Sequence, residues 1–195
     1  RPRTILKRMD GYGPEVRIDW LIVGGSARPW EEAGLAVSGR FIPLVGTGLE
    51  IAGDNQSGMR GWRASGAANP VEEIDGVWTT WEAGPNPTPE SVDHPVGVVS
   101  VDHVVVTTDD LSRTCEAIAD ALSAPLRRVR EAGRVRQGFH SVGHPREGGL
   151  IVEVVERSDA PAGRASLWGF TLVVEDLDAA CRHLGPDRVG EPKDA

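Results

Sequence analysis

The sequence predicts an α+β protein built from repeated βαβββ units, whose curved sheets are mixed and mostly antiparallel. Two strand–helix passages start their helices with the same dipeptide, Asp110-Leu111 and Asp176-Leu177, and the same shift in numbering carries Cys115 onto Cys181. We call this shift the repeat offset. Similarity at a fixed spacing is typical of a repeated structural unit. Short runs rich in β-branched residues, separated by glycine, supply the remaining strands of each unit.

The central unit, residues 98–157, opens with the run Val98–Val106, which is rich in β-branched residues and predicts a strand. Asp110 is a good helix N-cap. Apolar residues from Leu111 to Leu122 then recur on one stripe of an amphipathic helix, which Pro125 ends. A hairpin over 126–142 and a strand over 150–156 complete the order β-α-β-β-β.

The trailing unit, residues 166–195, repeats only the beginning of this pattern. A strand over 167–174 is followed by a helix that Asp176 caps and Gly185 ends. The three further strands are missing, and an unpaired strand edge promotes aggregation. We therefore expect the trailing strand to complete a sheet with another unit or a second chain, or the natural protein to run beyond Ala195.

The leading unit, residues 16–66, is a shortened copy of the same order. It comprises a strand over 16–23, a short helix over 26–32 that Ser26 would cap, and short strands over 40–45, 48–52 and 59–64. Residues 67–97 are rich in Pro, Gly and Asn and predict a linker, with one possible extra strand over 77–81.

Composition excludes several classes of partner. The formal net charge of −8 opposes binding to nucleic acid. No apolar run approaches the ~20 residues of a membrane-spanning helix. The two cysteines form no CxxC motif, and the basic N-terminus is not followed by an apolar segment, so no signal peptide is indicated. A cytoplasmic location is expected.

The residue pattern resembles a known superfamily. Asp102-His103 on the first strand of the central unit, with Glu153 between apolar residues on its last strand, is similar to the glyoxalase/bleomycin resistance protein/extradiol dioxygenase superfamily, also called vicinal oxygen chelate. The leading unit resembles the degenerate module of actinobacterial glyoxalase-like domain proteins. This resemblance implies paired modules that curve into a cup around a small organic molecule.

The resemblance also implies a divalent metal, held by the first and last strands of each module. His103 and Glu153 match these positions in the central unit, and Glu50 matches the last-strand position in the leading unit. Trp20 and Gly169 stand at the other two first-strand positions and cannot ligate a metal. The expected cofactor is therefore either none or one divalent metal ion.

Two interpretations of the central site remain open. His140 lies on the preceding strand, so His103, His140 and Glu153 could form the two-His-one-carboxylate set of non-haem iron sites, in which Glu153 could also act as a catalytic base. The alternative is a His–Glu hydrogen bond in a polar pocket without metal. Trp20 and Trp168 are further candidates for lining the pocket, because flat aromatic rings stack on planar ligands. His94, beside a proline, is expected to be solvated.

Three functions follow from these observations. The first is a metal-free glyoxalase-like protein that binds a small organic molecule. The second is a metal-dependent lyase, isomerase or dioxygenase that uses His103 and Glu153. The third is a structural or oligomerisation module without ligand. Nucleic acid and membranes are not expected partners, whereas a homodimer is compatible with the incomplete trailing unit.

Overall fold

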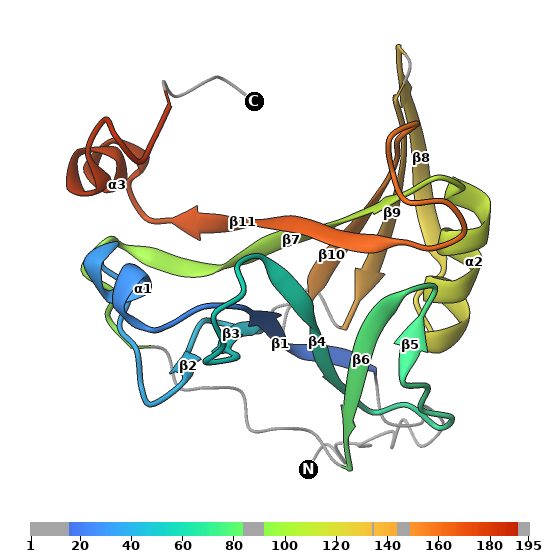
Figure 1. The fold of residues 1–195 in the computed structure, drawn as a ribbon, viewed down its shortest axis with the longest axis horizontal. Helices are drawn as coiled ribbons and strands as arrows, with labels where there is room; N and C mark the ends of the chain where they lie inside the picture. Colours follow the sequence, from blue (N-terminus) through green and yellow to red (C-terminus); the bar gives the residue numbers. More distant parts are fainter. Residues whose placement is uncertain (1–15, 84–91, 134, 144–148, 191–195) are drawn as a thin grey trace, which may run out of the picture.

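The computed structural model describes residues 16–83, 92–133, 135–143 and 149–190, and within them the chain forms two mixed sheets and three helices (Figure 1). Sheet A has the strand order β2-β3-β1-β4-β6-β5, and sheet B has the order β11-β7-β10-β9-β8. The predicted α+β class, with mixed and mostly antiparallel sheets, is confirmed.

Most of sheet B is the central unit, with the predicted order β-α-β-β-β. Strand β7 pairs parallel with β10, which pairs antiparallel with β9, and β9 pairs antiparallel with β8. The Asp110 side chain accepts a hydrogen bond of 3.0 Å from the backbone N–H of Arg113 and so caps α2, as predicted. The elements are β7 (Val98–Thr108), α2 (Leu111–Ala121), β8 (Leu126–Ala132), β9 (Val135–Val142) and β10 (Leu150–Glu156).

The trailing unit adds the fifth strand of sheet B. Strand β11 (Ser166–Val174) pairs antiparallel with β7, and α3 (Leu177–Leu184) follows it under an Asp176 cap. The trailing strand therefore completes a sheet with the central unit, which is one of the expected outcomes. The repeat offset matches His103 with Gly169 and Val105 with Thr171. In the β7–β11 pair, His103 lies opposite Thr171 and Val105 lies opposite Gly169, so a local twofold axis relates the two strands.

Sheet A follows the same plan with shorter elements. Strands β1 and β3 are parallel, β4 and β6 are parallel, and β1 and β4 are antiparallel neighbours at the centre. The elements are β1 (Arg17–Val23), α1 (Arg28–Glu32), β2 (Phe41–Ile42), β3 (Gly48–Ile51), β4 (Met59–Ser65), β5 (Glu73–Ile74) and β6 (Val77–Glu82).

Two expectations for this region were wrong. Residues 67–97 are not a linker throughout, because β5 and β6 lie within this range and extend sheet A beyond residue 66. The alternation of Val77 and Thr79, both buried, explains why β6 forms despite the surrounding Pro and Gly. Ser26 does not cap α1, since the helix starts at Arg28 after Ala27, without a side-chain capping bond.

A single hydrophobic cluster joins the two sheets, which lie against each other in Figure 1. It includes Leu21 and Trp62 of sheet A, Val104 and Val152 of sheet B, and Ile118 of α2, all essentially inaccessible to solvent. Because each sheet gives one face to this cluster, its opposite face points outward. We call these the outer faces of sheet A and sheet B.

Polar contacts also connect the two sheets. Asp75, in the turn between β5 and β6, accepts hydrogen bonds from Arg113 Nε (2.9 Å) and the Thr114 hydroxyl (2.5 Å), both on α2.

No helix in the described part of the chain is both long enough and apolar enough to cross a membrane.

Candidate functional site

The outer face of sheet B is set by the alternation of side chains along β10. Val152 and Val154 point into the core, so Ile151, Glu153 and Val155 point to the outer face. Strand β7 runs parallel to β10 with Ile151 opposite His103, which places His103 on the same face as Glu153. The family resemblance implied that these two residues could touch, and the parallel register of β7 and β10 brings them together.

Five polar residues meet on this face, and we call them the His103–Glu153 cluster. His103 Nε2 lies 3.5 Å from Glu153 Oε2 and 3.0 Å from the Thr171 hydroxyl. The Gln137 amide donates to Glu153 Oε1 at 2.6 Å, and Asp102 Oδ2 lies 2.7 Å from His103 Nδ1. The cluster thus comprises His103, Glu153, Gln137, Thr171 and Asp102.

Thr171 is a site residue that the sequence reasoning missed. The repeat offset maps it onto Val105, so a polar residue stands where the central unit has an apolar one. This replacement was the only signal in the sequence. Its significance depends on the antiparallel pairing of β7 with β11, which places Thr171 directly opposite His103.

The cluster is suited to binding polar groups on a small molecule. The Glu153 side chain is 13% exposed and lies between the aliphatic Ile151 and Val155, so its charge is partly desolvated. Two carboxylates and an imidazole provide mainly hydrogen-bond acceptors with one switchable donor. The side chains of His103 and Glu153 are 26% and 13% exposed, so solvent reaches both.

His140 does not join the cluster. It lies opposite Val152 in the β9–β10 pair and therefore faces the core, where only 1% of its surface is exposed. Its Nδ1 lies 2.7 Å from the carbonyl of Ala124, and burial lowers its pKa, so the ring is neutral. The three-residue set of His103, His140 and Glu153 is not assembled, because alternation along β9 turns His140 to the opposite face.

The two candidate tryptophans lie away from the cluster. Trp20 is on the outer face of sheet A, where its ring covers Gly48 and packs against Phe41 with 4.7 Å between ring centroids. Trp168 is left unpaired at an irregularity between Leu167 and Gly169 in β11, and it is 69% exposed. The structure therefore brings together only His103 and Glu153 of the five predicted pocket residues.

Comparisons with known proteins identify the fold. No protein-family model matches the chain, and no curated protein matches it either. Among solved structures, a triple mutant of 4-hydroxymandelate synthase from Streptomyces coelicolor matches 90% of this chain and 76% of its own, with a TM-score of 0.55 and 14% sequence identity. This chain has the vicinal oxygen chelate fold.

Other solved structures with the vicinal oxygen chelate fold match smaller portions. A methylmalonyl-CoA epimerase from Streptomyces coelicolor, in complex with 2-nitronate-propionyl-CoA, is 17% identical over 42% of this chain and 66% of its own. The epimerase from Mycobacterium tuberculosis is 22% identical over 45% of this chain and 63% of its own. Their TM-scores of 0.34 and 0.35 are too low to bear on the function of this chain.

A divalent metal is common in proteins with the vicinal oxygen chelate fold, but the side chains of this cluster do not fit one. A protein-held metal needs three or four convergent nitrogen or oxygen ligands. His103 and Glu153 supply two, while Thr171 is a neutral hydroxyl and Asp102 engages the far nitrogen of the imidazole. In the described ranges, no group of three or more His, Cys, Asp or Glu side chains could hold a metal ion.

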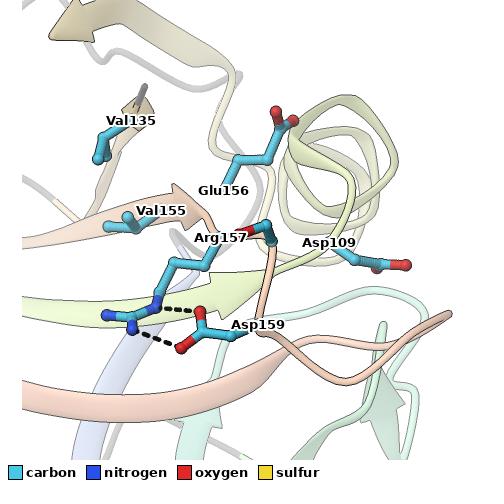
Figure 2. Close-up of a pocket in the computed structure, with 7 residues that line it drawn as sticks. Asp109, Val135, Val155, Glu156, Arg157 and Asp159 are labelled. Atoms are coloured by element: carbon cyan, nitrogen blue, oxygen red, sulfur yellow. Dashed lines mark hydrogen bonds and ion pairs between the residues drawn. The ribbon is translucent and has the colours of Figure 1, made fainter. Parts of the chain in front are cut away.

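A hollow of about 740 Å³ continues the outer face of sheet B at the end of β10 (Figure 2). Its charged residues are engaged by protein groups. Arg157 forms two hydrogen bonds of 2.8 Å with Asp159, which lower the pKa of that carboxyl, and Glu156 accepts from the backbone N–H of Leu111. The hollow therefore adds space beside the cluster, while the charges on its described walls are already paired. It is lined by Asp109, Val135, Val155, Glu156, Arg157, Ser158 and Asp159.

Proposed function

We propose that this chain binds a small organic molecule, without a metal, at the His103–Glu153 cluster on the outer face of sheet B. The observation that carries this proposal is the imidazole–carboxylate pair between aliphatic side chains, on a sheet face that the core does not use. Partly desolvating a carboxylate there costs free energy that folding alone does not require. A ligand that donates hydrogen bonds to Glu153 would offset that cost.

The chemistry of the cluster favours a ligand that donates hydrogen bonds. Glu153 and Asp102 are acceptors, and His103 can accept or donate according to its tautomer. Ile151 and Val155 flank the pair, and Phe139 lies opposite Glu153 in the β9–β10 register, so apolar surface surrounds it. A flat molecule with neighbouring hydroxyl groups satisfies both requirements. One solved structure with a similar fold is named as a 4-hydroxymandelate synthase.

The test is an NMR titration with catechol as the probe and 1,2-dimethoxybenzene as the matched ligand that cannot donate hydrogen bonds. Catechol is expected to shift amide signals of β7, β9 and β10 in a saturable way, whereas the dimethyl ether does not. Glu153→Gln and His103→Ala are each expected to weaken binding about tenfold, since a hydrogen bond to a charged group contributes about 1.5–3 kcal/mol. Arg40→Gln on sheet A is the control and retains binding. Equal binding of both ligands would refute the assignment.

The metal-free part of the proposal has its own measurement. Elemental analysis of the purified protein is expected to show no stoichiometric Zn, Ni, Mn or Fe. A stoichiometric metal that disappears in His103→Ala would instead favour the metal-dependent lyase, isomerase or dioxygenase, with ligands beyond the described residues.

A further inference from the structure

A second pocket, of about 460 Å³, lies on the outer face of sheet A. It is separate from the His103–Glu153 cluster, since none of its lining residues belongs to sheet B. Its volume falls within the range of small-molecule sites. The lining residues are Ile22, Arg40, Glu50, Ala52, Asp54, Arg60, Arg63 and Trp78.

Two guanidiniums, those of Arg63 and Arg40, bind the buried carboxylate of the pocket. The Glu50 side chain is 4% exposed, and both of its oxygens accept hydrogen bonds of 2.9–3.0 Å from Arg63. This fork-like pairing occupies both oxygens of Glu50, and Arg63 also donates to Glu82 at 2.7 Å. Arg40 nevertheless also donates to Glu50, from a side chain that is 55% exposed. Arg40 therefore places a second guanidinium at the pocket, with N–H groups turned toward solvent.

The remaining charges at the pocket are paired, and Arg40 is the most exposed of its cations. Arg60 pairs with Asp54 at 3.1 Å, and hydrogen bonds, first from the backbone N–H of Gly25, lower the pKa of Asp54 and keep it ionised. Three guanidiniums and two carboxylates line the pocket, and Glu82, which accepts from Arg63 at 2.7 Å, balances the third guanidinium from outside the lining. Arg40 is the most exposed of the three guanidiniums, at 55% of its side chain against 26% for Arg60 and 24% for Arg63, so it is the cation that an anion can reach.

One wall of the pocket is a flat apolar surface. The Trp78 ring is 48% exposed, and its other side packs over Gly61, where the missing side chain permits close contact. Ile22 and Ala52 add aliphatic surface. An exposed indole beside free guanidinium N–H groups suits a ring that carries a negative charge, because the ring stacks while the charge is hydrogen-bonded.

We propose that this pocket binds a flat organic anion, with the anionic group at Arg40 and the ring against Trp78. Arg63 holds Glu50 and positions the floor, and Arg60 pairs with Asp54 beside it. This is a second ligand class on the same chain, because the cluster on sheet B is rich in acceptors and favours ligands that donate.

The probe for this pocket is benzoate, with benzamide as the neutral ligand of the same shape. Calorimetry and Trp fluorescence are expected to show saturable benzoate binding that weakens as salt increases, and no benzamide binding. Arg40→Gln and Trp78→Ala are each expected to weaken benzoate at least about tenfold. Arg40→Gln keeps the Arg63 pairing of Glu50, so unfolding by urea should be little changed. Trp168→Ala and Arg128→Gln are exposed control variants on sheet B and retain binding.

Three results would overturn the proposal. They are benzamide binding as tightly as benzoate, unchanged benzoate binding in Arg40→Gln, and inorganic phosphate binding as tightly as benzoate, which would leave Trp78 without a role. Comparing phenyl phosphate with benzoate shows whether the pocket prefers a phosphate or a carboxylate as the anionic group. If either of these two ligands binds more tightly than inorganic phosphate, the proposal is supported. Glu153→Gln separates this site from the one on sheet B, since it weakens catechol binding and leaves benzoate binding intact.

Discussion

The outer faces of the two sheets carry the same carboxylate with different partners. In the strand register, Glu50 lies opposite Ile22, two residues after Trp20. Glu153 lies opposite Val105, two residues after His103, so the two carboxylates occupy equivalent places in the two sheets. In sheet A the antiparallel neighbour strand sets Arg63 opposite Trp20, and in sheet B it sets Thr171 opposite His103.

The residue on the neighbouring strand changes what each face offers to a ligand. Arg63 holds Glu50 with a fixed cation, so that carboxylate is no longer available to a ligand. Thr171 is neutral and short, so Glu153 keeps only His103 and Gln137 as partners among the described residues and remains 13% exposed. The repeated fold thus provides a position for a carboxylate, and the residue on the neighbouring strand decides whether that carboxylate is structural or can bind a ligand.

The largest effect is expected from breaking the ion pair on sheet A. Arg63→Met leaves Glu50 buried with only Arg40 as a cation, and losing one partner of a buried pair costs about 3–5 kcal/mol. We expect the free energy of unfolding in urea to fall by about 3 kcal/mol, the lower end of that range, because Arg40 compensates in part. Glu153→Gln on sheet B is the matched control and should cost less than about 1 kcal/mol. Similar losses in both variants would contradict the comparison.

Substitution by alanine should have different effects on stability at two equivalent glycines. Gly61 lies two residues before Arg63, and Gly169 lies two residues before Thr171. A methyl group at Gly61 would overlap the backbone oxygen of Trp78, whereas none of the described atoms lies near a methyl group at Gly169. Gly61→Ala is expected to lower the free energy of unfolding by about 1–3 kcal/mol, the usual cost of overpacking. Gly169→Ala should leave it nearly unchanged, as thermal unfolding of both variants can check.

Transferring the arginine tests whether one residue decides the function of a face. Thr171→Arg places a guanidinium opposite His103, where it is expected to pair with Glu153 as Arg63 pairs with Glu50. Catechol binding should weaken about tenfold, equivalent to about 1.4 kcal/mol, while benzoate binding on sheet A is unchanged. If Thr171→Arg bound catechol like the unaltered chain, Glu153 would not be the decisive acceptor.

The smallest effect concerns the aspartates that precede Trp20 and His103. Asp19 is buried, and burial raises its pKa above the ordinary 3.8, while Asp102 is half exposed. The folded protein therefore binds the Asp19 proton more tightly than the unfolded chain does. Its stability contribution is complete below about pH 3.8 and is lost as pH rises through the higher pKa of the folded state.

Asp19→Asn is accordingly expected to stabilise the protein modestly at pH 7, with a gain that disappears at pH 3. Urea unfolding at both pH values measures this, and Asp102→Asn is the comparison at the half-exposed aspartate. A gain for Asp19→Asn that persisted at pH 3 would show that burial of the charge is not its cause.

The local pattern of this sequence determined the elements of sheet B almost completely. Asp110 and Asp176 each cap a helix as predicted, because a side-chain oxygen at the N-cap satisfies a free backbone N–H wherever the helix lies. The strand over 150–156 forms with its predicted limits, since its β-branched residues favour an extended backbone. The repeat offset was also visible in the sequence and became the twofold pairing of β7 with β11.

Tertiary contacts decided what local pattern does not encode. His94 was expected to be solvated, yet it is buried and bridges the backbone of Ala36 and Pro43, because two distant segments close around it. The possible strand over 77–81 forms as β6, and its place in sheet A is set by parallel pairing with β4.

The sequence by itself determined the repeated unit and the chain order of its elements, and the family resemblance implied that His103 and Glu153 could touch. The tertiary structure alone decided that His140 faces the core, that Thr171 meets His103 and that Arg63 holds Glu50. The physical reason is that side-chain alternation and capping act between neighbours in sequence, whereas the face and the partner of each charge depend on strand register. Register is set by residues far apart in the chain.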